Sequence, residues 1–444
     1  MVESQTIDVR KEAQASFRGI IERYTGDPQR HNAAAQLAHV TTAVFDGMAN
    51  GTVPPPQCAQ LEITNRCSSG CRMCRRFTWT QSKHYTPDRE LSASRQIELL
   101  QELGGMGVRT VVFSGGEPLT HPELESLLEA ARGAGLRLGV LTNGVGITAA
   151  KAEALAAHAD WVRISIDNPP QQGGPGFKTV RRLLQPFKEE ESSIAEAVQR
   201  SIRNLKTARA KHRHSGLQIG FAYTMQATNV SLIREMVAYA SEQGVIVTFK
   251  FAHGTDAPFL CSERQLRWLW EEILSDESIV RNPFVNIRYL SEYVVRSLGM
   301  KDVARGTPTC TYYEHTPIRC FTPFAFSLID AFGGVYVCCH WYDDNGPLIS
   351  AQREEHRVGD VSQESFASAW TSARYQQVRR SLDPINVRTT PCSCCTRHWI
   401  PNTIMTQLYE DVYWPLVEGL GPNAARGVYG QLVNECSSEG PVWL

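Results

Sequence analysis

Short hydrophobic runs alternate with amphipathic stretches through the middle of the chain. Runs of this kind, rich in Val, Ile and Leu, are typical of buried strands, and the stretches between them have helical spacing. We predict six strands, at residues 59–64, 108–113, 136–141, 161–166, 217–225 and 245–252. Strands that alternate with helices indicate parallel βαβ units. The pattern therefore predicts an α/β fold, either a partial (βα)6 barrel or an open doubly wound sheet, with ligands at the carboxyl ends of the strands.

The same pattern marks where several helices begin and end. Helices are predicted at 94–103, 229–244 and 263–279. Thr120 and Glu123 have the spacing of a capping box, and Gly133 would end the helix that they begin.

Changes in pattern and composition divide the chain into five segments. Residues 1–57 are predicted to be an N-terminal helical cap, and residues 58–260 form the βα region. Residues 261–304 are predicted to be a helical linker. Residues 305–400 are rich in loops and Cys, which is typical of a small domain held together by metal. Residues 401–444 form a tail that the pattern does not place.

Composition narrows the range of functions. Of the 444 residues, 42% are hydrophobic and 20% are charged, with a net charge of −1, so the chain is not of the disordered class. A neutral chain has no strong field for a nucleic-acid backbone, and we expect no nucleic-acid partner. No apolar run approaches the ~18 residues that span a bilayer, and the start is polar. We expect no membrane association and a cytoplasmic location.

The 13 cysteines carry most of the chemical information. In a reducing cytosol, clustered cysteines bind metal more often than they form disulfides. Cys67, Cys71 and Cys74 form a C-x3-C-x2-C motif directly after the first strand. Three thiolates can hold three corners of an iron–sulfur cluster and leave one iron open for an exogenous ligand. A zinc site with a distant fourth ligand is the alternative.

Two motifs together resemble the radical SAM superfamily. The cysteine motif follows Leu61-Glu62-Ile63-Thr64-Asn65-Arg66, and Phe113-Ser114-Gly115-Gly116-Glu117-Pro118 ends the second strand. The resemblance implies that the three cysteines hold a [4Fe-4S] cluster whose open iron binds S-adenosylmethionine (SAM), which is cleaved to a 5′-deoxyadenosyl radical. It implies that Gly115, Gly116 and Glu117 bind the SAM amino group and that Met73 meets the adenine.

Polar residues follow the later strands as well. By the same resemblance, Asn143, Ser165 and Asp167 are candidates for contacts to the SAM ribose or carboxylate, although Asn-Gly and Asp are also ordinary turn formers. Lys250, along with His253 and Asp256, is a candidate to face substrate. Lys250, Asp167 and His253 are candidate bases for an alcohol proton.

Cys261 stands outside both cysteine groups. It could return a hydrogen atom in an epimerase, and an inert buried thiol is the alternative.

A second group of cysteines lies near the C-terminus. Cys320, Cys338, Cys392 and Cys395 could hold a complete auxiliary cluster suited to electron transfer, or a zinc ion. Their spacing resembles the auxiliary-cluster domains of the SPASM and shorter twitch type, and we expect one auxiliary [4Fe-4S] cluster. Further cysteines that could exchange with these ligands are Cys310, Cys339 and Cys394.

The sequence favours a radical SAM oxidoreductase that dehydrogenates a small polar natural product of the sugar, cyclitol or aminoglycoside type, as in antibiotic biosynthesis. The auxiliary cluster would accept an electron from the substrate radical, and an external donor such as flavodoxin or ferredoxin would supply the separate electron that cleaves SAM. The alternatives are a peptide-modifying maturase, a redox-neutral epimerase or dehydratase, and a zinc-stabilised binding module that is not an enzyme. The maturase ranks lower because residues 1–57 are too short for a leader-binding winged helix.

Overall fold

The structure is a computed structural model that describes most of the chain. The described residues are 2–23, 41–67, 69, 71, 74, 89–167, 169, 192–212, 216–251, 260–287, 290, 291, 294, 298, 319–338, 356–381 and 399–435. They fall into two compact units. The sheet unit comprises Cys58–Val294 and Phe326–Tyr375, and the helical unit comprises Met1–Gln57, Val295–Ala325 and Gln376–Leu444. Within the described part, no helix has both the length and the hydropathy that a membrane span requires.

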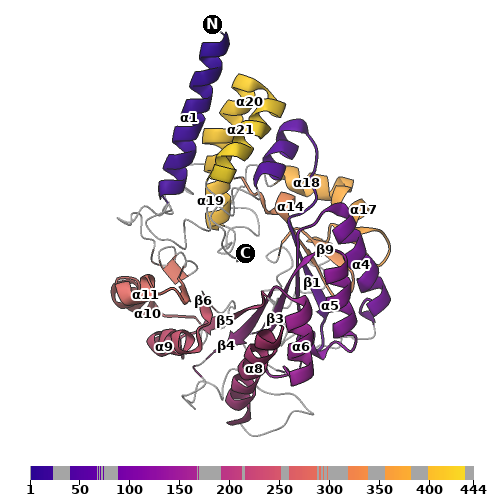
Figure 1. Cartoon of the computed structure of the whole chain (residues 1–444), viewed down its shortest axis with the longest axis vertical. Helices are drawn as coiled ribbons and strands as arrows, with labels where there is room; N and C mark the ends of the chain where they lie inside the picture. The colour runs from indigo at the N-terminus through magenta and orange to yellow at the C-terminus, as the bar shows by residue number, and fades with distance from the viewer. Residues whose placement is uncertain are drawn as a thin grey trace. The chain divides into compact units, whose positions relative to one another are not determined.

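One ten-stranded sheet forms the centre of the sheet unit (Figure 1), in the order β10-β9-β8-β1-β2-β3-β4-β5-β6-β7. All neighbours from β8 through β7 pair in parallel, and β9 and β10 are antiparallel. The six predicted strands are confirmed as β1 to β6, to within two residues at each end. The strands are β1 (Cys58–Thr64), β2 (Thr110–Gly115), β3 (Arg137–Thr142), β4 (Trp161–Ile166), β5 (Gln218–Met225), β6 (Ile246–Phe251), β7 (Val285–Asn286), β8 (Phe326–Ile329), β9 (Gly334–Tyr336) and β10 (Gly359–Asp360).

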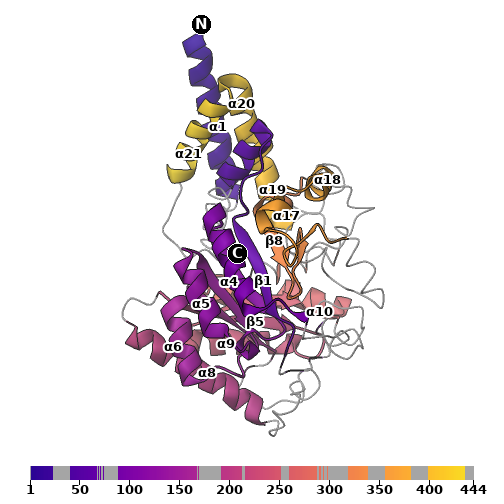
Figure 2. The same cartoon turned by 90° about the vertical axis from the view of Figure 1, so that its right-hand side faces the viewer.

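Strand β8 extends the parallel sheet beyond β1, although the two strands are far apart in the sequence. It pairs in parallel with β1, with Cys58 opposite Phe326 and Leu61 opposite Ile329, and Figure 2 shows the two strands side by side. This pairing satisfies the open edge of β1, which would otherwise expose backbone groups. The compact units therefore cut across the five segments expected from sequence, whose boundaries stay predictions.

Helices cover the outer face of the parallel strands (Figure 1). Neighbouring helices α4, α5, α6 and α8 pack in chain order. In α4, Leu99, Leu100 and Leu103 are buried at helical spacing, which explains the side that it presents to the sheet. The helices of this unit are α4 (Ala93–Met106), η2 (Pro118–Thr120), α5 (Leu124–Gly133), α6 (Ala149–His158), α8 (Ser192–Lys211), η3 (Val230–Leu232), α9 (Ile233–Gln243), α10 (Glu263–Trp268), η5 (Leu269–Ile273), α11 (Glu277–Val280) and α17 (Phe366–Thr371), with α18 (Ala373–Ser381) running from it into the helical unit.

The helix ends follow the predicted signals only in part. Gly244 caps α9 in the left-handed conformation, with φ of 61°, as expected. The predicted capping box at Thr120 is wrong, because α5 begins after Glu123 with no side-chain cap. Thr120 instead belongs to the 3-10 turn η2, and its hydroxyl donates to the carbonyl oxygen of Glu117 at 2.7 Å.

The helical unit has an aromatic core. The ring of Phe45 lies 5.1–5.6 Å from the rings of Phe321, Tyr409, Tyr413 and Tyr429. Residues from the N-terminal cap and from the C-terminal tail therefore share one hydrophobic cluster. Its helices are α1 (Val2–Arg23), residues 41–50, α14 (Thr322–Ala325), α19 (Trp399–Leu408), η7 (Tyr409–Tyr413), α20 (Trp414–Leu420) and α21 (Pro422–Glu435).

Candidate functional site

The loop after β2 lies directly against the chain that leads from β1 into Cys67. The backbone N–H of Gly116 donates to the carbonyl of Thr64 at 2.7 Å, and that of Glu117 donates to the carbonyl of Arg66 at 2.8 Å. A Cβ on Gly115, where φ is +128°, would lie 2.2 Å from the Thr64 oxygen, and one on Gly116 would lie 2.2 Å from the Arg66 oxygen. Both glycines are therefore required by this close backbone approach. Their predicted contact with SAM stays a prediction.

The carboxylate of Glu117 joins the ends of β2 and β3. It is buried, and one oxygen accepts from the Thr142 hydroxyl at 2.7 Å and from the Leu119 N–H at 3.1 Å. The other oxygen accepts from the Asn143 N–H at 2.6 Å. The structure thus fixes a negative charge at the carboxyl ends of the strands. This placement suits the predicted ammonium contact, because carboxylates form strong charge-assisted bonds.

Replacing Glu117 by Ala removes the acceptor for three donors at once. Because buried donors that lose their acceptor are costly, we expect Glu117→Ala to lower the free energy of unfolding by about 3 kcal/mol. Urea denaturation of the apo protein measures this loss. Glu123→Ala is the matched control, since Glu123 is exposed and its side chain caps nothing. Equal stability of the two variants would contradict the structural role of Glu117.

The loop that carries Cys67, Cys71 and Cys74, called the cysteine loop below, is held by hydrogen bonds within itself and to the end of β3. The N–H of Ser69 donates to the Cys67 sulfur at 3.4 Å, and the N–H of Cys74 donates to the Cys71 carbonyl at 2.9 Å. The Asn143 amide donates to the Ser69 hydroxyl at 3.2 Å, so the end of β3 contacts this loop. Met73, the fourth predicted site residue of the loop, lies outside the described residues.

The donor chemistry of this loop fits an iron–sulfur cluster. Three thiols stand within eight residues, and iron–sulfur clusters take cysteine thiolates as ligands. Within the described residues, no three His, Cys, Asp or Glu side chains already converge on one metal position. The fit therefore rests on the kind and spacing of the donors.

Two polar residues, Glu90 before α4 and Gln96 within it, bond to the end of β1, which leads to Cys67. The Glu90 carboxylate accepts from the Asn65 N–H at 2.7 Å and from the Thr64 hydroxyl at 3.0 Å. The Gln96 amide donates to the Ile63 carbonyl at 3.0 Å. Neither residue was predicted from the sequence, because a polar residue at a helix start carries no distinctive local signal.

The remaining strand-end candidates lie on β4 and β6. Ser165 is half-buried on β4, and Asp167, just after this strand, is buried. The Asp167 carbonyl accepts from the side-chain amide of Asn229 at 2.6 Å. Asn229 was not predicted to be a site residue. Lys250 is half-buried and pairs with β5 near the strand ends. The structure thus places Ser165, Asp167 and Lys250 at the expected edge of the sheet, and their roles stay predictions. His253 and Asp256 lie outside the described residues.

Cys261 is half-buried just before α10, and burial raises its pKa to about 11. The sulfur therefore keeps its hydrogen at neutral pH, as a hydrogen-atom donor must. Since a pKa of 11 in place of 9 lowers the thiolate fraction, alkylation of Cys261 by iodoacetamide at pH 8 should be about 100-fold slower in folded apo protein than in urea. Peptide mass spectrometry measures both rates. Similar rates would show that the thiol is not shielded in the folded protein.

The auxiliary cysteines are only partly described. Cys320 lies in the helical unit and Cys338 in the sheet unit, and both are buried. The other predicted ligands and their possible substitutes lie outside the described residues: Cys392, Cys395, Cys310, Cys339 and Cys394. The ligand set of the auxiliary cluster stays a prediction.

Two family models match the chain. The model of the radical SAM superfamily matches residues 61–218, which include the first cysteine group. The SPASM model, described as an iron–sulfur cluster-binding domain, matches residues 320–396, which include the second group.

Two kinds of enzyme are among the proteins similar to this chain. A pre-heme d1 synthase of Dinoroseobacter shibae is 23% identical over 380 residues, which cover 81% of this chain and 83% of the synthase. A PqqA peptide cyclase of Ruegeria pomeroyi is 34% identical over 116 residues, covering 26% of this chain and 30% of the cyclase. Another, of Gluconobacter oxydans, is 29% identical over 195 residues, covering 44% of this chain and 48% of the cyclase. The chain therefore aligns with less than half of the length of these two cyclases.

A solved structure shares the fold. The structure of anSMEcpe with bound AdoMet superposes with a TM-score of 0.51 at 13% identity, covering 86% of this chain and 97% of that one. The likeness supports the predicted α/β architecture and nothing finer.

Proposed function

Because the chain belongs to the radical SAM superfamily and carries a SPASM domain, we propose that it is an enzyme that modifies a peptide by hydrogen-atom abstraction. The two domains imply a SAM-bound [4Fe-4S] cluster and auxiliary iron–sulfur binding, as the cysteine motifs predicted. When bound and reduced, the cluster and SAM supply a 5′-deoxyadenosyl radical. The zinc-stabilised binding module loses its support, since the second matched domain is described as iron–sulfur binding.

Residues at the carboxyl ends of β1, β2 and β3 would bind the cluster and SAM. Cys67, Cys71 and Cys74 would hold the cluster. Glu117 lies buried where the ends of β2 and β3 meet, and its carboxylate would accept the SAM ammonium. Asn143, which contacts Ser69 of the cysteine loop, would bind the ribose or the carboxylate of SAM.

The similarity to PqqA peptide cyclases carries the choice of a peptide substrate. It favours the maturase alternative over the sugar-type substrate that the sequence analysis ranked first. Within residues 1–57, the described stretches 2–23 and 41–50 are helical and contribute to the core of the helical unit. The proposal assigns no leader-binding role to them.

A small molecule is the second candidate. The similarity to pre-heme d1 synthase extends over 81% of this chain, much further than the similarity to the cyclases. Under this candidate, oxidation assisted by the auxiliary cluster remains the reaction type. In both cases we propose flavodoxin or ferredoxin as the electron donor.

Stimulated SAM cleavage distinguishes the two substrate classes. Anaerobically reconstituted enzyme is mixed with SAM, dithionite and size fractions of an extract from the organism that carries the gene, and 5′-deoxyadenosine is measured. We expect the peptide fraction to stimulate release and proteinase K treatment of that fraction to abolish the effect. Stimulation only by the small-molecule fraction, resistant to proteinase K, would support the second candidate. No release of 5′-deoxyadenosine from iron-loaded enzyme would contradict radical SAM chemistry.

A further inference from the structure

The start of α4 contacts both cysteine-bearing parts of the sheet unit. On one side, Glu90 and Gln96 bond to the end of β1, which leads into Cys67. On the other side, the N–H of Leu91 donates to the carbonyl of Ala331 at 2.8 Å, in the turn between β8 and β9. One stretch of chain, residues 90–102, therefore contacts both the end of β1 and the β8–α17 segment, which we define as residues 326–338 and 356–371.

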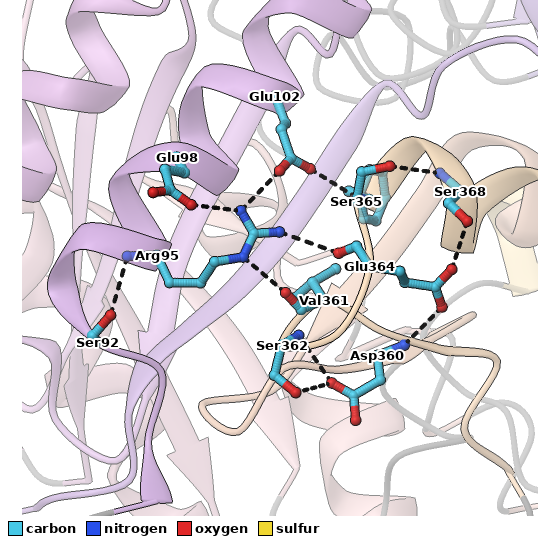
Figure 3. Close-up of polar contacts among 11 residues, drawn as sticks. Ser92, Arg95, Glu98, Glu102, Asp360, Val361, Ser362, Glu364, Ser365 and Ser368 are labelled. Atoms are coloured by element: carbon cyan, nitrogen blue, oxygen red, sulfur yellow. Dashed lines mark hydrogen bonds and ion pairs between the residues drawn. The ribbon is translucent and has the colours of Figure 1, made fainter.

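Arg95 makes the densest of these contacts (Figure 3). Its Nε donates to the Val361 carbonyl at 2.8 Å, and its Nη2 donates to the Glu364 carbonyl at 3.2 Å. Its Nη1 donates to Glu102 at 2.8 Å and to Glu98 at 3.3 Å. All three nitrogens of the planar guanidinium are used, and the side chain is only 21% exposed. A lysine ammonium cannot reproduce this arrangement, because it is a point charge without the rigid fork.

Glu102 extends these contacts from α4 to helix α17. The oxygen that does not bind Arg95 accepts from the Phe366 N–H at 2.8 Å, at the first residue of α17. Ser365, the N-cap of α17, accepts from the Ser368 N–H at 3.2 Å, as Figure 3 shows. A carboxylate at a helix start is favourable, because it meets unsatisfied N–H groups and the positive end of the helix dipole.

The segment to which Arg95 bonds is connected to Cys338 through strands β10 and β9. The N–H of Val361 donates to the Gly333 carbonyl at 2.8 Å, and β10 pairs with β9 through Gly359 and Val335. Strand β9 ends at Tyr336, two residues before Cys338. Fixing residues 361–366 therefore fixes the strand pair from which Cys338 emerges.

We propose that Arg95 is a positioning residue for the auxiliary cluster, setting strand β9, which leads to Cys338, relative to strand β1, which leads to Cys67. The inference rests on the proposed function, because it takes Cys338 as a cluster ligand. Arg95 touches neither cysteine and acts through the backbone of residues 361–364 and through Glu102. Outer residues that orient metal ligands commonly change metal affinity when they are replaced.

The test uses the full chain in which Cys67, Cys71 and Cys74 are replaced by Ala, so that any remaining iron belongs to the auxiliary site. Into this protein we introduce Arg95→Ala, Arg95→Lys or, as a matched control, Glu98→Gln. Glu98 also contacts Arg95, but its carboxylate is largely exposed and Arg95 is its only partner in the network of Figure 3. Iron release to bathophenanthroline and the EPR spectrum of the reduced auxiliary cluster are measured.

We expect Arg95→Ala to release iron about tenfold faster than the Glu98→Gln protein and to show shifted g values. Arg95→Lys should be intermediate, and it keeps the comparison valid if Arg95→Ala does not fold. Release rates and spectra equal to those of Glu98→Gln in both Arg95 variants would overturn the inference. The wild-type chain, assayed separately for SAM cleavage, tests the proposed function, so the two failures are distinguishable.

Discussion

Replacing Cys67, Cys71 and Cys74 together by Ala should reduce 5′-deoxyadenosine release from SAM below detection. These residues are the predicted thiolate ligands of the radical SAM cluster, which takes cysteine thiolates as its protein ligands. The variant should also lose about four irons per chain and retain those of the auxiliary site. Iron analysis after anaerobic reconstitution and chromatography of the nucleoside product measure the two effects.

The control for this experiment is Cys58→Ala. Cys58 lies on β1 as well, it is 3% exposed, and burial raises its pKa to about 12, so it is an inert packing thiol. We expect Cys58→Ala to keep its iron and its SAM cleavage. Full iron content in the triple variant would mean that the motif does not hold the cluster. Retained iron in the auxiliary site, about four or about eight per chain, would also give the number of auxiliary clusters.

The sheet was predictable from sequence where its signals are local. Strands β1 to β6 are short apolar runs, each visible within its own few residues, and the parallel order follows from the helices between them. The pairing of β8 with β1 was not predictable, because Phe326 and Cys58 are distant in the sequence and β8 is only four residues long. No local pattern predicts which open edge of a sheet a short strand will join.

The site was predictable to the same degree. Motif residues pointed to the loops after β1 and β2, and Asn143, which contacts Ser69, was singled out because it follows a strand. Their roles toward SAM stay predictions. The supporting residues were missed, since Glu90, Gln96 and Arg95 act by bonding to distant backbone groups rather than through a motif. The capping box at Thr120 shows the converse. The pattern was present, but the tight turn after Glu117 places the Thr120 hydroxyl elsewhere.

The glycines after β2 lead to the second large expected effect. A side chain on Gly116 would place its Cβ 2.2 Å from the Arg66 oxygen and 2.6 Å from the Asn65 oxygen. Both are backbone atoms of the chain entering the cysteine loop, so they cannot move unless the loop moves. We expect Gly116→Ala to lower the free energy of unfolding by about 3 kcal/mol and to reduce iron loading of the first cluster.

Gly105→Ala is the matched control, because Gly105 lies in α4 with nothing within 4 Å of the added Cβ. That change should raise the free energy of unfolding by about 0.5–1 kcal/mol, the helix preference of Ala over Gly. Urea denaturation of apo protein, without SAM or iron, separates two explanations of Gly116. If Gly116 is needed for the close packing of its backbone against Asn65 and Arg66, the variant is already less stable than wild type in the apo state. If it serves only the approach of SAM, the apo variant is as stable as wild type and only SAM binding is lost.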